Sequence, residues 1–195
     1  MSSGTCWVRT SVVLLWLCVP HLPACSSLPR MNVPHDPLTA EDHVALGTAY
    51  EAQGLKDLAA REFQAALEQR KDYPPALISL GNLAFEAGAL ADAEEYYRRV
   101  LEVDSSQPSA NNNLAMVYLQ RGERLAEAER LARTALAQGG PLKPYVLETL
   151  ANIYFRQGRH REVKEALDEA EVIVPSSNTT LRARLAKTRQ ELTHH

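Results

Sequence analysis

The sequence has no cysteine after residue 25 and few aromatic side chains. Only 6% of its 195 residues are aromatic, and all three cysteines and both tryptophans lie in the first 25 positions. The rest of the chain therefore cannot hold a disulfide framework, a zinc site with cysteine ligands or a cysteine nucleophile. The shortage of aromatic residues beside abundant leucine and alanine favours helices over a strand-rich sandwich or barrel.

The chain also lacks a block of charge of one sign. Its 21 basic and 24 acidic residues are mixed along the sequence and give a net charge of −3. No polybasic segment is present to neutralise phosphates, so nucleic acid is excluded as a partner. A hydrophobic content of 45% argues against disorder, and the length fits one domain or at most two small ones.

The amino terminus is typical of a signal peptide. A polar start with one charge, Arg9, precedes an apolar run over residues 12–19. This run would rise only about 12 Å as a helix, against the roughly 30 Å of a bilayer core, so it cannot span a membrane. The residues Leu-Pro-Ala-Cys at 22–25 resemble the bacterial lipobox. That resemblance implies that residues 1–24 are removed and that Cys25 is acylated.

The residues around the predicted cleavage site bear on localisation. Ser26 follows Cys25, and in the sorting rule of many Gram-negative lipoproteins a residue other than aspartate directs the protein to the outer membrane. Residues 25–38, with three prolines, form an extended tether that keeps the folded part near the membrane. Two alternatives remain: an ordinary signal peptide cut near Ala24 that releases a soluble periplasmic protein, and a start at Met31 that leaves a cytosolic one.

The remaining sequence repeats with a period of about 34 residues. The repeat is marked by glycines that are 34, 34 and 36 positions apart: Gly54, Gly88, Gly122 and Gly158. Each glycine ends a predicted helix, because only glycine adopts a positive φ at low cost. The prolines after residue 38 lie at repeat boundaries, where a helix begins or must stop.

These motifs resemble the tetratricopeptide repeat, a helix-turn-helix unit. The resemblance predicts a TPR array over residues 39–177, with repeats at about 40–73, 74–107, 108–143 and 144–177. Two small positions where the helices of a repeat cross carry the family pattern: Gly47, Gly81, Ala115 and Ala151 in the first helices, and Ala59, Ala93, Ala128 and Val163 in the second. The fold class implied is an all-α, right-handed superhelical solenoid of about four TPR helix pairs with a C-terminal capping helix.

The third repeat departs from the regular spacing. It has one extra residue after Gly122, which predicts a local kink there.

The C-terminal end of the array has its own signal. Residues 178–195 form the predicted capping helix, with Leu181, Leu185 and Leu192 on one face. Its basic residues are interpreted as a solvated face, and Asn178 as the residue that caps its start.

In this family the first helix of each pair lines a concave groove. Carried over by motif position, the resemblance implies a peptide-binding groove that is apolar, aromatic and amide-bearing. Its predicted residues are Val44, Thr48, Ile78, Asn82, Phe85, Asn112, Met116, Leu119, Tyr145, Asn152 and Phe155.

The asparagines in this set have two possible roles. Their amides can donate to and accept from a bound peptide backbone at once. They can equally link adjacent repeats or face water. The two roles stay open for Asn82 and Asn112, whereas a structural role is favoured for Asn111.

Together these features predict a non-catalytic scaffold or adaptor that binds a protein or peptide partner of the cell envelope. It would be held by its lipid on the periplasmic face of the bacterial outer membrane. It resembles bacterial repeat lipoproteins that help to assemble type IV pilus secretins or export machinery, so assembly of a pilus, secretion or export complex is the expected role. We expect no cofactor and no metal, because His160 and the terminal histidines lack partners at metal-ligand spacing.

Three other functions are alternatives to this one. The chain could be a soluble periplasmic or enzyme-associated TPR subunit, or an enzyme whose groove positions catalytic groups. A glycan-binding module has little support, because the groove offers few aromatic platforms.

Overall fold

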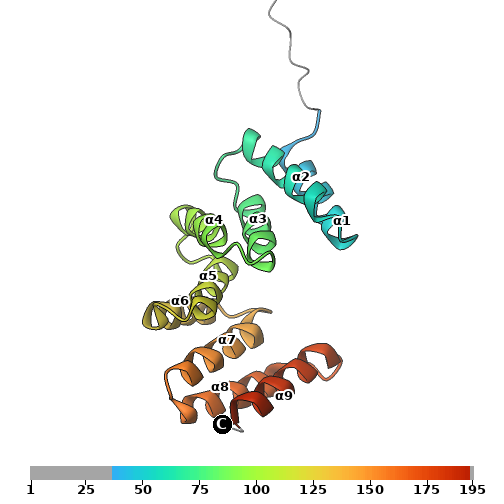
Figure 1. The fold of residues 1–195 in the computed structure, drawn as a ribbon. Helices are drawn as coiled ribbons and strands as arrows, with labels where there is room; N and C mark the ends of the chain where they lie inside the picture. The colour runs from blue at the N-terminus through green and yellow to red at the C-terminus, as the bar shows by residue number, and fades with distance from the viewer. Residues whose placement is uncertain (1–36, 194–195) are drawn as a thin grey trace, which may run out of the picture. The chain divides into compact units, whose positions relative to one another are not determined.

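The computed structural model describes residues 37–193, and every regular element in that range is an α-helix (Figure 1). The predicted signal peptide and Cys25 lie outside the described residues. The helices are α1 (Ala40–Ala52), α2 (Lys56–Gln69), α3 (Pro74–Glu86), α4 (Leu90–Val103), α5 (Pro108–Arg121), α6 (Leu125–Gln138), α7 (Lys143–Arg156), α8 (His160–Ile173) and α9 (Thr179–Thr193).

Local sequence signals explain where the helices begin and end. At the start of α1, the Thr39 hydroxyl accepts from the backbone N–H of Asp42, whose carboxylate accepts from the Thr39 N–H in return. Proline stands in the first turn of α3, α5 and α7, where a missing N–H costs nothing. The glycines after α1, α3, α5 and α7 have φ between 70° and 75°, as their spacing predicts.

The helices pack as four successive pairs followed by α9. Within a pair α1 packs on α2, α3 on α4, α5 on α6 and α7 on α8, and each second helix packs on the first helix of the next pair. The first helices of neighbouring pairs also contact one another: α1 contacts α3, α3 contacts α5 and α5 contacts α7, and α7 in turn contacts α9. The second helices of the described chain make no such contacts with each other. The first helices therefore share one closely spaced side of a helical repeat solenoid, which confirms the predicted all-α fold class.

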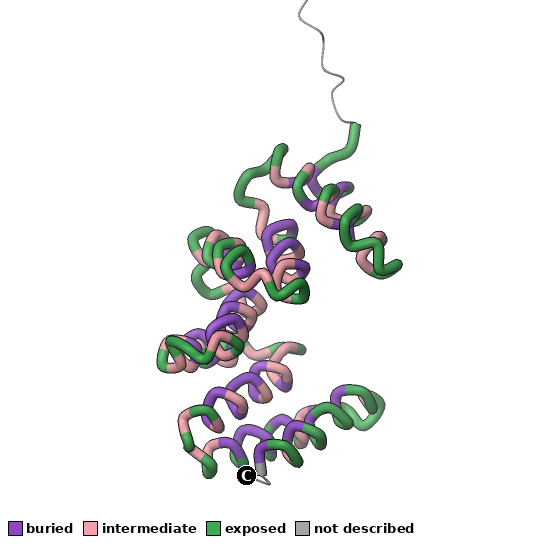
Figure 2. The backbone as a smooth tube through the Cα atoms, in the orientation of Figure 1, coloured by how far each residue is buried: buried purple, intermediate pink, exposed green. Residues whose placement is uncertain are grey.

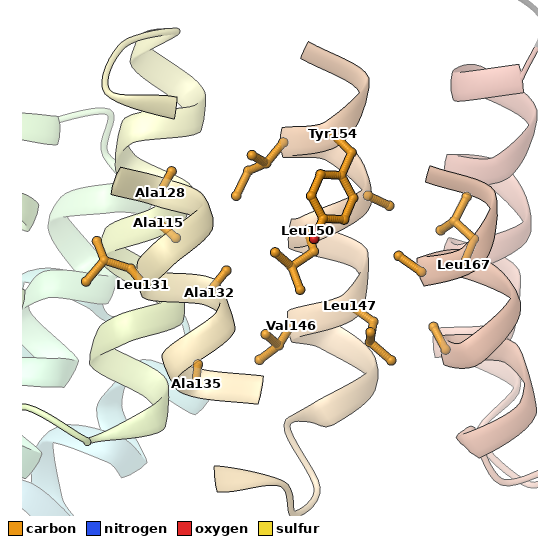
Figure 3. Close-up of a cluster of buried hydrophobic side chains, with 14 of the residues drawn as sticks. Ala115, Ala128, Leu131, Ala132, Ala135, Val146, Leu147, Leu150, Tyr154 and Leu167 are labelled. Carbon is orange, nitrogen blue, oxygen red and sulfur yellow. The ribbon is translucent and has the colours of Figure 1, made fainter. Parts of the chain in front are cut away.

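The buried residues follow the faces where these helices meet (Figure 2). In the third and fourth pairs, α7 lies between α6 and α8, with Val146 on the side of α6 and Leu147 on the side of α8 (Figure 3). Both side chains are almost fully buried, as are Ala132 of α6 and Leu167 of α8. The largest buried cluster therefore runs from Tyr97 of the second pair to Leu192 of α9, and another joins the first two pairs, because a single pair cannot bury its apolar faces alone.

In each of the first two pairs, a glycine of the first helix faces an aromatic ring of the second helix. The absence of a side chain on this glycine allows the two helices to pack closely. A Cβ added to Gly47 would lie 2.5 Å from Cε1 of Phe63, and one added to Gly81 would lie 2.5 Å from Cε1 of Tyr97. Both rings are buried. Glycine is thus required where the ring of the second helix lies directly on the backbone of the first.

A network of ion pairs and hydrogen bonds around one glutamate joins the second and third pairs. Glu94 of α4 accepts from the Tyr118 hydroxyl of α5 at 3.0 Å and pairs with Arg98 and Arg124 at 2.9 and 3.1 Å, and with Arg121. Arg124 also lies over the Tyr118 ring, 4.3 Å from its centroid. Burial alone would raise the pKa of Glu94, but the bonds from Tyr118 and Arg121 and the nearby Arg98 outweigh it, so this pKa lies below its usual value.

A related arrangement recurs one repeat later, in which a glutamate pairs with arginines and one of these arginines lies over a tyrosine ring. Glu129 of α6 pairs with Arg133 at 2.9 Å and with Arg159 at 2.8 Å, and Arg159 lies 4.4 Å from the centroid of the Tyr154 ring. Burial opposes ionisation here too, yet hydrogen bonds from Arg133 and Gln157 and the nearby guanidinium groups lower the pKa of Glu129. A glutamate of one pair, with a tyrosine and an arginine of the next, is therefore a repeated link between neighbours.

The extra residue of the third repeat lies in the loop between α5 and α6. Arg124 has a φ of 53° and is the only non-glycine residue with positive φ in the described chain. Its bonds to Glu94 and Glu127 hold it in this unfavourable conformation. Helix α6 keeps 14 residues, as in α2, α4 and α8, so the backbone change is taken up by the loop.

Helix α9 closes the C-terminal end of the array by packing on α7 and α8. Its predicted apolar face is confirmed, since Leu181, Leu185 and Leu192 are buried. The Asn178 side-chain oxygen accepts from the backbone N–H of Leu181 at 3.0 Å, so Asn178 caps the start of α9 as predicted. Within residues 37–193, no helix combines the length and the apolar character needed to cross a bilayer.

Candidate functional site

The side formed by the first helices carries a groove made of three adjoining hollows. The α3 hollow, of about 290 Å³, is lined by Glu51, Asn82, Phe85, Glu86, Tyr97, Asn113 and Met116. The central hollow, of about 480 Å³, is lined by Phe85, Met116, Leu119, Gln120, Asn152, Phe155, Arg156 and Leu192. The α7 hollow, of about 440 Å³, is lined by Asn112, Asn113, Met116, Leu119, Leu142, Tyr145, Glu148, Thr149, Asn152 and Arg184. Met116 borders all three, so they form one continuous surface, the inner groove.

Most of the predicted binding residues line this groove: Asn82, Phe85, Asn112, Met116, Leu119, Tyr145, Asn152 and Phe155. Val44, Thr48 and Ile78 do not line any of the three hollows. Val44 and Ile78 pack against buried clusters between the helices. The Thr48 hydroxyl donates to the Val44 carbonyl of its own helix at 2.8 Å. The groove is thus built mainly from the second, third and fourth pairs.

The α3 hollow has an acidic edge. Glu51 of α1 is half-buried, and its pKa is raised by burial and then by repulsion from Glu86 of α3. Lys56 pairs with Glu86 at 2.8 Å. Two carboxylates and one ammonium group therefore leave this end of the groove with an excess of negative charge.

Asparagine amides join the second and third pairs across the floor of the groove. The Asn82 side-chain oxygen accepts from the Tyr97 hydroxyl at 2.8 Å and from the Asn113 amide at 2.9 Å. Asn111 donates to the carbonyls of Ser105 and Gln107 at 2.9 and 3.0 Å. The structural role is thus confirmed for Asn111, and Asn82 links adjacent repeats through its oxygen.

The α7 hollow is closed on one side by α9. The Glu148 carboxylate of α7 accepts from the Arg184 guanidinium and, at 3.0 Å, from the Thr188 hydroxyl. Arg184 also lies 4.9 Å from the centroid of the Tyr145 ring. Arg189 pairs with Asp168 and Glu171 of α8. Arg184 is exposed, as the interpretation of a solvated face predicts, and it also pairs with Glu148; Arg189 is partly buried, and both residues attach α9 to the last pair.

Among the described residues, no group of three or more His, Cys, Asp or Glu side chains is arranged to hold a metal ion. His160, at the start of α8, is exposed and meets the edge of the Phe155 ring at a centroid distance of 6.2 Å. What the groove offers is an apolar surface with fixed amides, which suits binding.

Sequence reasoning missed the contributions of the loops and of α9 to the groove. Leu142 precedes α7, and Arg184 and Leu192 belong to the capping helix. Motif positions of the first helices contain no information about either segment. The available signal was the opposite charge of Glu148, in the first helix of the last pair, and of the basic residues of the capping helix.

Comparisons with known proteins agree with this architecture. A family model described as "Tetratricopeptide repeat" matches residues 44–111, 78–141 and 112–178. A tetratricopeptide repeat protein from Parabacteroides merdae has a similar structure, with a TM-score of 0.66 and 19% identity over 82% of this chain. This chain spans 60% of the length of that protein.

Two further solved structures share the fold. PilF of Pseudomonas aeruginosa gives a TM-score of 0.63 at 21% identity, covering 80% of this chain and 71% of PilF. A MamA mutant gives 0.57 at 21% identity, with 72% of this chain and 81% of MamA covered. At these identities the likeness is one of fold. With the family model matching most of the helical array, the chain belongs to the tetratricopeptide repeat family.

Proposed function

We propose that this chain is a non-catalytic scaffold whose inner groove binds a segment of another polypeptide of the cell envelope. The observation that carries the proposal is the continuous groove over α3, α5 and α7. Its apolar residues Phe85, Met116 and Leu119 are only partly buried by the rest of the chain. An apolar strip flanked by amides suits a peptide that buries side chains and is oriented by a few hydrogen bonds.

We further propose that the scaffold is a lipoprotein, anchored through Cys25 on the periplasmic face of the bacterial outer membrane. The support is the lipobox-like segment 22–25 and the residue that follows it. The fold shared with PilF, and the resemblance to pilus assembly lipoproteins, favour a role in assembling a pilus, secretion or export complex. A soluble periplasmic TPR subunit is the alternative if Cys25 is not acylated.

Site-specific photocrosslinking in cells tests the groove. A photoreactive amino acid replaces Gln120, an exposed residue of the central hollow, or as a control Val172 of α8, which is 83% exposed. We expect a discrete adduct with an envelope protein from position 120 and none from position 172. Equal adducts from both positions, or none from position 120, would contradict binding in the groove.

The anchor needs a separate experiment. Cells are labelled with an alkyne fatty acid, and the chain is compared with its Cys25→Ala variant. We expect label and membrane association in the parent and neither in the variant. An unlabelled parent that fractionates with soluble periplasmic proteins would favour the alternative and leave the groove proposal standing.

A further inference from the structure

The three hollows of the inner groove differ in charge. In the α7 hollow, the Glu148 carboxylate pairs with the Arg184 guanidinium, so these two charges cancel. Among the described residues, Arg156 is the only charged one that lines the central hollow. The α3 hollow is lined by two charged residues, Glu51 and Glu86, and both are acidic. The groove is therefore negative at its α3 end and neutral or positive along the rest.

The Glu51 carboxylate has no direct partner in the part of the chain that the structure describes. None of residues 37–193 donates a hydrogen bond to it or forms an ion pair with it, and its oxygens remain accessible. Burial raises the pKa of Glu51 and repulsion from Glu86 raises it further, while Lys56 opposes this with a smaller effect. A cation that entered the hollow would therefore stabilise the ionised form of Glu51.

Glu86 of α3 supplies the second carboxylate. It pairs with Lys56 of α2 at 2.8 Å, but the two side chains are 50% and 58% exposed. Ion pairs this exposed contribute little, because water competes for both charges. Lys56 is not one of the described residues that line the hollow, and one ammonium group cannot neutralise two carboxylates. A net negative charge thus remains for an occupant.

The rest of the α3 hollow suits a long aliphatic stem. Phe85 and Met116 supply apolar surface, and both are only partly buried. The Asn82 oxygen is not free, because it already accepts two hydrogen bonds within the protein. The volume of about 290 Å³ is small for a ligand pocket, which fits one side chain. The hollow thus combines apolar walls with an unpaired carboxylate.

We infer that the α3 hollow is a subsite for a basic side chain, lysine or arginine, of the polypeptide bound in the inner groove. Its aliphatic stem lies on Phe85 and Met116, and its charged head pairs with Glu51. This inference rests on the proposed function, because it names a residue of the partner that enters that same groove. Lysine and arginine bury their stems on apolar surface while the head stays at a polar edge, and this hollow supplies both.

Other side chains fit this end of the groove less well. A carboxylate would be repelled by Glu51 and Glu86. A leucine or phenylalanine could cover Phe85 and Met116 but would bury the Glu51 carboxylate further without a counter-charge. The basic side chain also sets the direction of the bound segment, because Arg156 repels a cation from the central hollow.

The test uses a random library of short linear peptides displayed on phage and selected on the full chain. Binding in the groove is established by crosslinking from position 120 and not from position 172. In each groove-binding peptide, every lysine is replaced in turn by 6-hydroxynorleucine and every arginine by citrulline, which keep the shape of the side chain and remove its charge. Affinities are measured at about 0.15 M salt, where exposed charges more than about 8 Å apart are largely screened.

We expect each peptide to contain a basic residue whose neutral analogue binds about 3- to 10-fold more weakly. On the Glu51→Gln variant this ratio should fall below about 2-fold, because the unpaired carboxylate is gone and Glu86 still has Lys56 as its partner. The control Glu165→Gln changes the net charge equally at a residue that lines none of the three hollows, and on it the ratio should persist.

A thermal melt verifies that each variant is folded, and the comparison on the parent chain needs no variant. Groove-binding peptides that carry no basic residue, or that bind equally without its charge, overturn the inference but leave the proposed function intact. The same holds for a ratio that persists on Glu51→Gln, or that Glu165→Gln reduces as much. If no selected peptide crosslinks from position 120, both the inference and the proposed function fail.

Discussion

Replacing Gly81 by alanine is expected to destabilise the protein, although alanine is the better helix former. The substitution gains about 1 kcal/mol of helix propensity. The new Cβ, however, would lie 2.5 Å from Cε1 of Tyr97, a ring that is 1% exposed. Because the Tyr97 hydroxyl is bonded to Asn82, the ring cannot turn away without losing that bond as well. Overpacking of about 1–3 kcal/mol and a weakened hydrogen bond of about 1 kcal/mol, less the propensity gain, leave a net loss of about 1–3 kcal/mol.

Thermal and urea unfolding followed by circular dichroism measure this loss. For a chain of this size, at about 2–4 °C per kcal/mol, the expected fall in Tm is about 2–12 °C. The fourth pair has alanine and leucine at the places of Gly81 and Tyr97, which gives a matched control. In a Tyr97→Leu background, Gly81→Ala should stabilise the protein, because the clash is gone and the propensity gain remains. A rise in Tm for Gly81→Ala with Tyr97 intact would refute the packing argument.

The remaining predictions concern the links between repeats and the helix ends. In urea titrations, Glu94→Gln should lower the free energy of unfolding by about 1–2 kcal/mol, because the Glu94 side chain is 16% exposed and accepts hydrogen bonds from charged partners. The control Glu165→Gln, which removes a charge from an exposed ion pair, should change this free energy by less than about 0.5 kcal/mol. Since the pKa values of Glu94 and Glu129 are lowered by folding, their stabilisation is present above the usual glutamate pKa and lost as pH falls through the folded values. Tm should therefore drop with acidification below about pH 4.5, and by less in Glu94→Gln; an equal drop in both proteins would contradict this. Gly88→Ala should cost about 1 kcal/mol by thermal melting, because φ is 75° with open space around it; an unchanged Tm would show that the positive φ is not needed.

The helical array could be predicted because its signals are local. Gly54 and its equivalents end the first helices, prolines begin three of them, and small residues stand where helices cross. Each of these signals depends on backbone conformation or on a contact within one pair. The predicted groove positions on α3, α5 and α7 line the inner groove for the same reason, since they follow from helix phase.

What escaped prediction depends on contacts between distant segments. Glu94 meets partners on the next helix pair, and its role depends on the loop conformation at Arg124, which the sequence does not show. The two hydrogen bonds that Asn82 accepts could not be predicted either, because one of them comes from Asn113, and the sequence does not show that this residue of the next pair lies beside Asn82. The position of Arg184 depends on the angle at which α9 crosses the last pair.

Methyl NMR of the full chain tests the central claim, that the inner groove holds another polypeptide. Met116 borders all three hollows, and of the three methionines in the sequence it alone lies in the described part of the chain. With methionine methyl groups labelled, and Met116 assigned from Met116→Leu, a saturating peptide that crosslinks from position 120 should shift the Met116 signal. A Met116 signal that does not move while the peptide is bound would contradict the account.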